Sequence, residues 1–444
     1  MTPAPRRGGP PREDGPRGAI LVLYYSRHAP LRASVADHLY SIRRHSGRPC
    51  IYVNLAVRRI PRWVDRLGID LVVFHTLLLA TRWHRPMLRR VLERLEPVRK
   101  LDCPKVALPQ DEYIHTDALS AFVRDFKVDR VLTCAPESEL RKVYGDLVDG
   151  PTTFTRVLPG YLEPETVARI EAMATSRPRT IDIGYRAYDP EFSLGRHAQL
   201  KSAVARVFAA AGRRAGLTTD ISLKAADTLL GDDWYRFLLD CRWVVGVEGG
   251  ASLLDRDGAF LERSRAFQKA HPEATFEEAE AACFPGADGG LDYTAISPRH
   301  LEACVTRTGQ ILVEGSYNGI LQPGVHYLPV RADFSDVDEV LALAADDGVR
   351  ERLTERAHRD VVAAAKHTYP SFVRTVLESL PDGGTVPATS LRALRVTWDS
   401  ILDRPSWWIV RAAARARRWG RAILDRVGLL DLALRVRDRA GRGN

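Results

Sequence analysis

Short apolar runs alternate with longer amphipathic stretches along the first half of the chain. The runs have the length of buried strands, and the stretches between them carry apolar residues at helical spacing. This alternation predicts βαβ units and a parallel sheet. The expected strands cover residues 19–25, 50–55, 70–74, 105–108, 128–133 and 153–158. The clearest expected helices cover residues 31–45 and 85–98.

The alternation restarts after a Pro-Gly pair and a helical stretch at residues 164–175, which predicts a crossover into a second domain. The expected strands of this domain cover residues 180–185, 242–247 and 310–313, and a short connection begins at Ser222. The expected helices cover residues 199–211 and 234–240, one that opens at Ser297, and residues 337–344 and 349–380. Two such units in tandem form a cleft at the carboxyl ends of their strands.

The predicted fold class is therefore α/β, with two tandem Rossmann-like doubly wound domains. We expect an N-terminal domain at 18–165, a C-terminal domain at 176–380 and a helical tail at 388–444. Residues 1–17 lack an apolar segment, so we expect a disordered start rather than a secretory signal. No apolar run is long enough to predict a transmembrane helix.

Charge and cysteine usage narrow the function classes. The net charge is +9, of which residues 391–444 supply +8 from 13 Arg and 5 Asp. The rest of the chain is nearly neutral, which argues against a nucleic-acid-binding groove in the two domains. The basic tail predicts contact with an anionic surface. The 6 cysteines include no Cys-x-x-Cys pair, so we expect isolated thiols in a reducing cytoplasm rather than disulfides or a zinc site.

The most informative stretch begins at Ser297-Pro298-Arg299, which opens a helix that carries Glu302. A helix N-terminus offers free N–H groups to phosphate, and a carboxylate one turn later can bind ribose hydroxyls. This layout resembles the donor half of GT-B glycosyltransferases, in particular the group-1-like family that includes spore-coat-type glycosyltransferases. The resemblance is best over residues 180–375.

The resemblance implies glycosyl transfer from a nucleotide sugar, with Arg186 and Lys201 on the donor diphosphate and Glu302 on the ribose. Fixed cations would stabilise the negative charge that grows on the departing phosphate without a metal. Many relatives carry a second Glu where this chain has Thr294. The stereochemical outcome is therefore open, and retention is favoured by family analogy alone.

Glu248, Gly249 and Gly250 follow a predicted buried strand. Glycines at such a strand end let the backbone approach a ligand closely, and Glu248 could touch the sugar or the base. A plain tight turn is the alternative interpretation of these residues.

In the first domain, Asp111 and Glu112 follow a predicted strand and are candidates for acceptor binding or general-base work. His75 and His28 also follow strands and could meet the acceptor hydroxyl. A histidine at a strand end is more often a structural hydrogen-bonding group, and this alternative stays open for both.

Other enzyme motifs are absent from the sequence. We find no Gly-x-Ser-x-Gly of a hydrolase and no Gly-x-Gly-x-x-Gly of a dinucleotide enzyme after the first strand. Asp255-Arg256-Asp257 matches the Asp-x-Asp of metal-dependent transferases over three residues only. We interpret it as a polar turn and infer no metal and no cofactor.

The tail carries Trp398, Trp407, Trp408 and Trp419 among arginines and apolar residues. This pattern is typical of basic amphipathic helices that lie on anionic membranes, with Trp at the headgroup level. Docking on the protein body or on a second subunit is the alternative.

The sequence predicts a metal-independent, hexosyltransferase-like glycosyltransferase of the cytoplasm, held peripherally on the membrane. Its partners would be a nucleotide sugar and a glycan or lipid-linked acceptor in cell-surface polysaccharide or glycoconjugate synthesis. The alternatives are a nucleotide-sugar epimerase on the same fold and a non-catalytic scaffold of a polysaccharide assembly complex.

Overall fold

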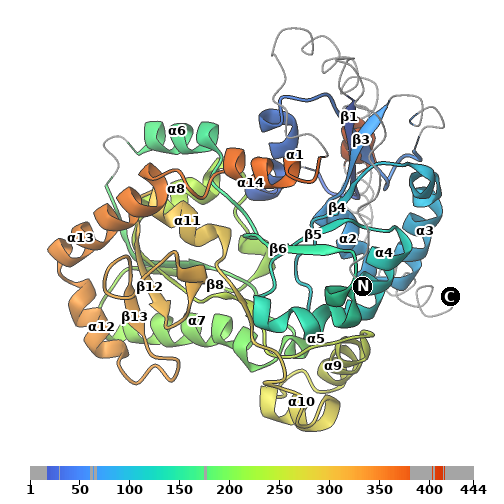
Figure 1. Cartoon of the computed structure of the whole chain (residues 1–444). Helices are drawn as coiled ribbons and strands as arrows, with labels where there is room; N and C mark the ends of the chain where they lie inside the picture. The colour runs from blue at the N-terminus through green and yellow to red at the C-terminus, as the bar shows by residue number, and fades with distance from the viewer. Residues whose placement is uncertain are drawn as a thin grey trace, which may run out of the picture.

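The computed structural model describes residues 18–29, 31–60, 64, 68–174, 178–380, 403, 406–413 and 415. Within these ranges the chain forms two parallel β-sheets, each packed against helices (Figure 1). The predicted disordered segment 1–17 and most of the predicted tail 388–444 lie outside the described residues.

The first sheet has the strand order β2-β1-β3-β4-β5-β6, and all neighbouring strands are parallel. Its strands are β1 (Ala19–Tyr24), β2 (Cys50–Asn54), β3 (Ile69–Phe74), β4 (Lys105–Ala107), β5 (Arg130–Thr133) and β6 (Thr153–Arg156). Its helices are α1 (Ala33–His45), α2 (Thr76–Leu79), α3 (Arg85–Leu95), α4 (Thr116–Asp125) and α5 (Leu140–Tyr144). The strands and helices predicted for this half all form. The central strand β1 buries every residue, as a strand covered on both faces does.

Helix α6 (Pro164–Met173) leads to a second sheet with the order β13-β12-β9-β7-β8, again parallel throughout. Its strands are β7 (Ile181–Arg186), β8 (Thr219–Ser222), β9 (Cys241–Gly246), β12 (Gly309–Val313) and β13 (Leu328–Val330). Its helices are α7 (Arg196–Arg214), α8 (Asp232–Asp240), α11 (Pro298–Val305), α12 (Val337–Ala344) and α13 (Asp347–Ala357). In both sheets the first strand lies between the second and the third. The predicted fold class, two tandem Rossmann-like doubly wound domains of the GT-B kind, is confirmed by these sheets.

Strand β8 was not predicted, because the sequence pattern assigned no element to residues 212–221 and only a short connection from Ser222 onward. Its sequence, Thr-Asp-Ile-Ser, has one apolar residue and pairs only with β7 at the sheet edge. An edge strand with every residue half-buried carries no continuous apolar run for the pattern to detect.

The sequence pattern also assigned no elements to the segment between β9 and α11. There the chain forms the antiparallel pair β10 (Gly249–Ala251) and β11 (Tyr293–Ala295), with α9 (Ala259–Ala270) and α10 (Phe276–Cys283) between them. This segment packs on the first domain, whose core includes Leu261, Leu291 and Tyr293. It therefore ties the second half of the chain to the first on one side of the cleft.

The single helix predicted at 349–380 is wrong. Helix α13 and a π-helical turn end before Ala365, whose φ of 50° no helix adopts. Helix α14 (Tyr369–Leu377) then starts afresh, with Pro370 in its first turn. Phe372 and Val376 of α14 are buried in the core of the first domain, against α1. The end of the second half thus crosses back to the first.

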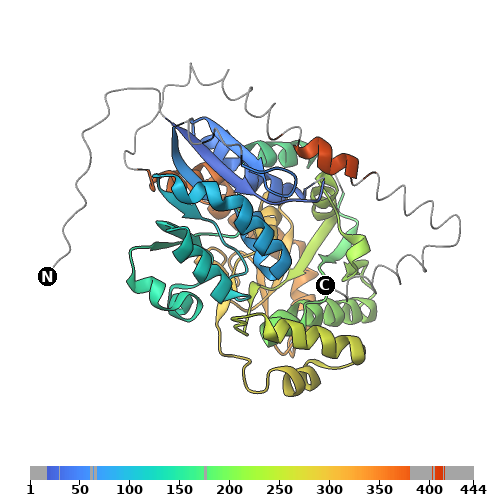
Figure 2. The same cartoon turned by 90° about the vertical axis from the view of Figure 1, so that its right-hand side faces the viewer.

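The described part of the tail docks on the first domain. The carboxylate of Asp403 accepts hydrogen bonds from Tyr24 Oη at 2.6 Å and Tyr40 Oη at 3.0 Å. The Trp407 ring stacks on Tyr24 with 6.0 Å between centroids. Residues 406–413 form a short helix, which Figure 2 shows in red beside the blue first domain. For these residues the docking alternative holds, and a membrane role for the tail stays a prediction.

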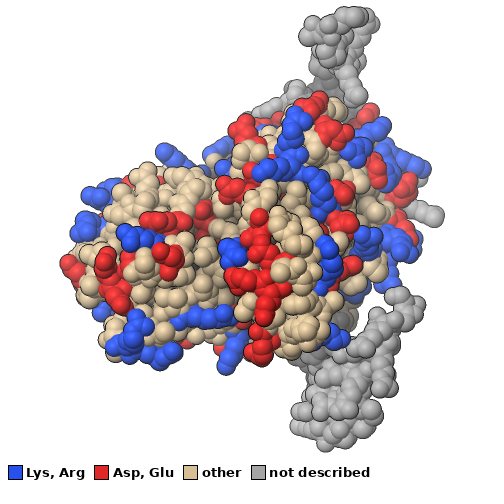
Figure 3. Space-filling view, turned by 90° about the horizontal axis from the view of Figure 1, so that it is seen from below, with Lys and Arg blue, Asp and Glu red and all other residues tan. Residues whose placement is uncertain are grey.

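None of the helices in the described ranges combines the length and the apolar character needed to cross a bilayer. Lys and Arg are interspersed with Asp and Glu over the face that carries α7, α9 and α10 (Figure 3). Many of these side chains pair, as Arg196 does with Glu277 at 2.8 Å. This mixture agrees with the small net charge of the chain outside the tail.

All six cysteines are free thiols, five of them buried, as the sequence predicted. Burial raises the pKa of several of them, including Cys304, whose pKa rises to about 12. A buried, protonated thiol behaves as a small apolar side chain, so these residues serve packing.

Candidate functional site

Two adjoining cavities lie where the carboxyl ends of the two sheets face each other. We name the first, of about 230 Å³, the Trp234 cavity and the second, of about 240 Å³, the Tyr293 cavity. Both are lined by residues of both domains. They share Arg32, Ala187, Tyr188, Ser297, Pro298 and Arg299, and so form one continuous cleft.

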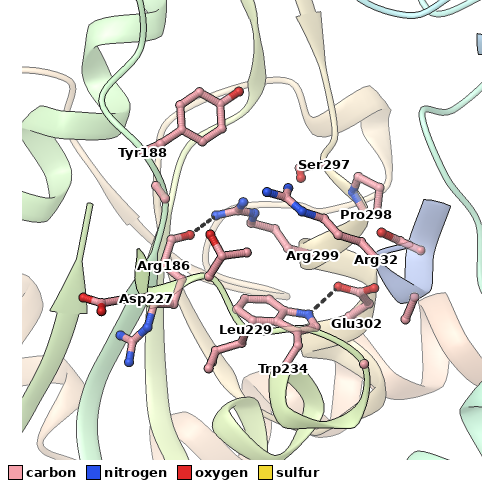
Figure 4. Close-up of a pocket in the computed structure, with 15 residues that line it drawn as sticks. Arg32, Arg186, Tyr188, Asp227, Leu229, Trp234, Ser297, Pro298, Arg299 and Glu302 are labelled. Atoms are coloured by element: carbon pink, nitrogen blue, oxygen red, sulfur yellow. Dashed lines mark hydrogen bonds between the residues drawn. The ribbon is translucent and has the colours of Figure 1, made fainter. Parts of the chain in front are cut away.

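The N-terminus of α11 lies at the junction of the two cavities. Ser297 precedes the helix, and no side chain in the described ranges caps the helix at this position. The Arg299 guanidinium donates to the backbone carbonyl of Arg186 at 2.7 Å (Figure 4). Arg299 forms no ion pair with a described carboxylate, so its charge and the helix dipole are both available to an anion. Pro298 has no N–H and His300 N donates to Ser297 O at 3.0 Å, so of residues 298–300 only Arg299 keeps a backbone N–H without a described partner.

Two further cations line the cleft. Lys201 on α7 lines the Tyr293 cavity, and no described residue forms a hydrogen bond or an ion pair with its ammonium group. Burial and the nearby charge of Arg299 lower the pKa of Lys201, against the opposing effect of Asp111. Arg32, just before α1, lines both cavities and comes from the first domain.

Arg186, predicted to hold the diphosphate, lines the Trp234 cavity, but its guanidinium is engaged by the protein itself. It pairs with Asp220 Oδ2 at 2.7 Å and lies over the Phe237 ring, with 4.4 Å to the centroid. Its contribution to the cleft is the carbonyl that holds Arg299. The partner Asp220 lies on β8, the strand that the sequence pattern missed.

The N-terminus of α7 is also closed to a ligand. Asp288 Oδ1 accepts from Arg196 N at 3.1 Å, and Ser252 Oγ accepts from His197 N at 3.1 Å. A side chain at Gly195, where φ is 78°, would overlap both of these capping groups. The protein's own carboxylate therefore takes the place of an anion at this helix end.

The Trp234 cavity combines an aromatic wall with a carboxylate. Glu302 Oε2 accepts from the Trp234 indole Nε1 at 2.7 Å (Figure 4). Burial raises the pKa of Glu302, while this hydrogen bond and the charge of Arg299 lower it. The loop that carries Asp227 and Leu229 forms another wall. Such a cavity can take a flat ring with attached hydroxyl groups.

Glu248, Gly249 and Gly250 have mainly structural contacts. The buried Glu248 carboxylate accepts from Ser316 N at 2.9 Å and Tyr317 N at 2.6 Å, and so holds the loop after β12. A side chain at Gly250 would overlap the carbonyl of Tyr293 on β11. The close backbone approach that these glycines permit is to β11, although both also line the Tyr293 cavity.

Asp111 is the acidic side chain that lines the Tyr293 cavity. Its φ is 51°, in the left-handed region that few residues other than Gly adopt. Its Oδ1 accepts from Tyr113 Oη at 2.8 Å, and its Oδ2 has no hydrogen-bond partner among the described residues. Tyr113, Tyr185 and Tyr293 give this cavity the mixed aromatic and polar lining that suits a sugar ring.

The other three first-domain candidates lie away from the cavities. Glu112 is fully buried and accepts hydrogen bonds from the hydroxyls of Thr133, Tyr144 and Tyr293 and from Cys134 N. A carboxylate enclosed by four donors cannot reach an acceptor hydroxyl. Glu112 is therefore not placed as a base in this structure.

His75 is buried, with Nε2 at 2.8 Å from His38 Nδ1, and its Nδ1 accepts from Leu77 N at 3.1 Å. This ring caps α2, as the structural alternative expected. His28 is exposed and lines neither cavity. The structure thus leaves Asp111 as the first-domain candidate in contact with the cleft.

Asp255 begins a turn, as predicted, and its carboxylate accepts from Gly258 N at 3.0 Å and Leu261 N at 2.9 Å at the start of α9. In the searched part of the chain, no group of three or more His, Cys, Asp and Glu side chains is arranged to hold a metal ion.

Arg32, Tyr188 and Trp234 also line the cleft, although they were not among the predicted site residues. Arg32 and Tyr188 stand in loops after the first strand of each sheet, which is where ligands meet doubly wound domains. That position was the one signal that could have found them, since no motif marks them.

No protein-family model matches this chain. No curated protein matches it in sequence either.

Solved structures share its architecture at low similarity. HepE of Anabaena, in complex with UDP-glucose, has a TM-score of 0.43 at 10% identity, over 82% of this chain and 100% of HepE. Sucrose-phosphate synthase from Thermosynechococcus elongatus has a TM-score of 0.43 at 12% identity, over 82% and 98%. TarM has a TM-score of 0.40 at 9% identity over 70% of this chain and 55% of TarM, so this chain spans about half of TarM. At this level of similarity, function has to be argued from this chain's own residues.

Proposed function

We propose that the cleft binds a nucleoside diphosphate sugar and that the chain is a glycosyltransferase. The observation that carries the proposal is the junction of the two cavities. There, Arg32 and Arg299 line both cavities beside the N-terminus of α11, Lys201 lines the adjoining Tyr293 cavity, and none of the three pairs with a described carboxylate. A diphosphate is the anion that fits several cations and a helix end at once.

The two cavities would divide the donor at its diphosphate. The nucleoside would lie in the Trp234 cavity, with its ring against aromatic side chains and its ribose hydroxyls donating to Glu302. The sugar would lie in the Tyr293 cavity together with the acceptor. This arrangement keeps the role predicted for Glu302 and gives Lys201 and Arg299 the diphosphate.

The transfer step follows from this placement. The acceptor hydroxyl attacks the anomeric carbon, the bond from that carbon to the phosphate oxygen breaks, and its electron pair stays on the departing diphosphate. Asp111 accepts the hydroxyl proton. Arg299, Lys201 and the α11 dipole stabilise the growing phosphate charge, which is the basis for proposing that no metal is required.

The acceptor class follows from the lining of the Tyr293 cavity. Tyrosine rings together with Gln110 and Asp111 suit a hydroxylated ring, so we propose a glycan or lipid-linked glycan acceptor in cell-surface polysaccharide or glycoconjugate synthesis. A cytoplasmic position on the inner face of the membrane is part of the same proposal.

A thermal-shift panel with UDP, GDP, dTDP, CDP and CMP tests the donor site. A nucleoside diphosphate at about 100 times its dissociation constant should stabilise the protein by roughly 2.7 kcal/mol. The shift should vanish in Arg299→Ala. A folded wild-type protein that no nucleotide stabilises would contradict the proposal and favour the scaffold alternative.

Product analysis then separates the enzymatic alternatives. The selected nucleotide sugar is incubated with and without glycan acceptors. Release of the nucleoside diphosphate that depends on an acceptor supports transfer. Conversion of the nucleotide sugar to its epimer without an acceptor would support an epimerase instead.

A further inference from the structure

The loop that presents Asp111 is held in an unfavourable backbone conformation. Asp111 and His115, both between β4 and α4, have φ values of 51°. A non-glycine residue in such a conformation carries a free-energy cost and persists only where its surroundings impose it. Two buried ionisable side chains supply that constraint here.

Arg82 is the first of them, and it is 2% exposed. Its guanidinium donates to four backbone carbonyls, those of Leu79 at 3.0 Å, Gln110 at 2.9 Å, Asp111 at 2.6 Å and Ile114 at 3.1 Å. Three of the four carbonyls belong to the Asp111 loop. None of the described carboxylates forms an ion pair with Arg82, so its buried charge is used entirely to hold backbone.

Glu112 is the second, and it is fully buried. Its Oε1 accepts from Thr133 and Tyr144, and its Oε2 accepts from Cys134 N at 2.9 Å and Tyr293 Oη at 2.6 Å. These donors come from β5, the turn after it, α5 and β11, so one carboxylate joins the Asp111 loop to both halves of the chain. Burial raises the pKa of Glu112, and these four hydrogen bonds lower it.

Removing a guanidinium and a carboxylate from water costs several kcal/mol each, and apolar side chains would fill the same space at lower cost. The two groups do not repay this by pairing with each other. Together they fix the position of Asp111. Arg82 donates a hydrogen bond to the Asp111 carbonyl, and Glu112 is the next residue in the chain.

We propose that Arg82 and Glu112 are positioning residues, which hold the loop so that Asp111 presents its free carboxylate oxygen to the reacting hydroxyl. This inference rests on the proposed function and adds two residues that do not touch the substrates. A misplacement of about 1 Å at a reacting group can cost on the order of 100-fold in rate, which is the benefit that offsets the burial.

Glu112→Gln and Tyr144→Phe test the proposal, because each weakens the enclosure of Glu112 without touching a cavity. We expect kcat to fall on the order of 10- to 100-fold in Glu112→Gln and a few-fold in Tyr144→Phe. Donor affinity should stay within about twofold, since the diphosphate site lies on other elements. Amide hydrogen exchange should become faster across residues 108–115.

Matched controls separate positioning from general stability. Glu163→Gln changes another buried carboxylate, which pairs with Arg44 at 3.0 Å, and Tyr52→Phe removes another buried hydroxyl, which donates to Leu39 O at 3.0 Å. Both should lower the melting temperature without changing kcat or exchange in the Asp111 loop. Arg82→Lys, which keeps the charge but cannot reach four carbonyls, should behave like Glu112→Gln.

Results that overturn the positioning role alone can be told apart from a result that also overturns the proposed function. Wild-type kcat or unchanged loop exchange in Glu112→Gln, in a protein that binds nucleotide and transfers sugar, overturns the positioning role alone. Equal losses of kcat in the controls overturn it as well. A wild-type protein that binds no nucleotide removes the proposed function, and the positioning role falls with it.

Discussion

Two helices of the second domain, α7 and α11, begin at the edge of the same cleft, yet their N-termini differ. At α7 the first free N–H groups donate to Asp288 and Ser252. At α11 no described side chain caps the helix, and Arg299 adds a charge without a carboxylate partner. A helix end attracts anions only while its donors remain free, so α11 is the proposed phosphate site, whereas the capped end of α7 is not.

The two arginines of this region repeat the contrast. The Arg186 guanidinium is neutralised by Asp220, whereas the Arg299 guanidinium is held by a neutral carbonyl and keeps its full charge toward the cleft. Position in the sequence placed both near the donor. Which arginine can bind a diphosphate depends on whether its guanidinium is already paired with a carboxylate.

Arg299→Ala should have the largest effect on nucleotide binding. Loss of charged hydrogen bonds to phosphate should cost about 2–3 kcal/mol, or on the order of 100-fold in affinity. Isothermal titration calorimetry with the nucleotide that the panel selects measures this loss. Arg186→Ala is the matched control, and it should lower the melting temperature while changing affinity less than about threefold. The reverse ranking of the two variants would break the comparison.

Asp288→Ala should affect stability rather than binding. Removing the cap of α7 should lower the free energy of unfolding by about 1–2 kcal/mol, as measured by urea denaturation. Asp346→Ala, which removes the side-chain cap of α13, should cost a similar amount. A change of more than tenfold in nucleotide affinity in Asp288→Ala would show that α7 takes part in the phosphate site.

Lys201→Ala should weaken nucleotide binding about tenfold through the loss of one charge near the diphosphate. Arg206→Ala removes one charge from the same helix but from a side chain that is 72% exposed and paired with Asp189. We expect Arg206→Ala to leave the dissociation constant unchanged. Equal losses of affinity in both variants would mean that Lys201 acts only through the overall charge of the protein and not through contact with the diphosphate.

The pH dependence of binding should identify Lys201 as well. Burial and Arg299 lower the pKa of Lys201, so its ammonium loses the proton at a lower pH than a free lysine does. Because the charged form binds phosphate, affinity should fall as the pH rises from 7 toward 10. Lys201→Met should show a flatter profile over the same range. A wild-type profile that is equally flat would contradict this assignment.

Glu302→Gln should have the smallest effect, about threefold in affinity, because a neutral amide can still accept a ribose hydrogen bond. Its specific signature is discrimination. The wild type should prefer the ribonucleotide over its 2′-deoxy analogue, and the variant should lose part of that preference. Glu314→Gln, which changes an exposed carboxylate after β12, should leave the preference intact.

Much of the fold could be predicted because parallel strands are continuous apolar runs, and β1 and β12 are buried along their whole length. The strands that escaped prediction, β8, β10, β11 and the three-residue β13, are held by tertiary contacts instead. β8 is polar, and β10 consists of Gly-Gly-Ala paired to β11 more than 40 residues later. The helix predicted at 349–380 failed because Ala365 and Pro370 end one helix and begin another.

The candidate site could be predicted where function needs a local motif, as at Ser297, Arg299 and Glu302, which together line the cleft. The site could not be predicted where the direction of a side chain decides whether that residue reaches the ligand. The partner that engages the Arg186 guanidinium lies on β8, and the group that caps α7 lies 92 residues further along the chain. Arg82 and Glu112 belong to no sequence motif, because their proposed role depends on the buried hydrogen bonds that surround them in the fold.

The central claim is that α11, and not α7, binds the donor diphosphate. A crystal structure with the nucleoside diphosphate that the panel selects tests it most directly. We expect phosphate oxygens within hydrogen-bonding distance of the Arg299 guanidinium and of the Arg299 backbone N–H, with Asp288 still on α7. A diphosphate at the start of α7 with Asp288 displaced, or bound to the Arg186 guanidinium, would contradict it.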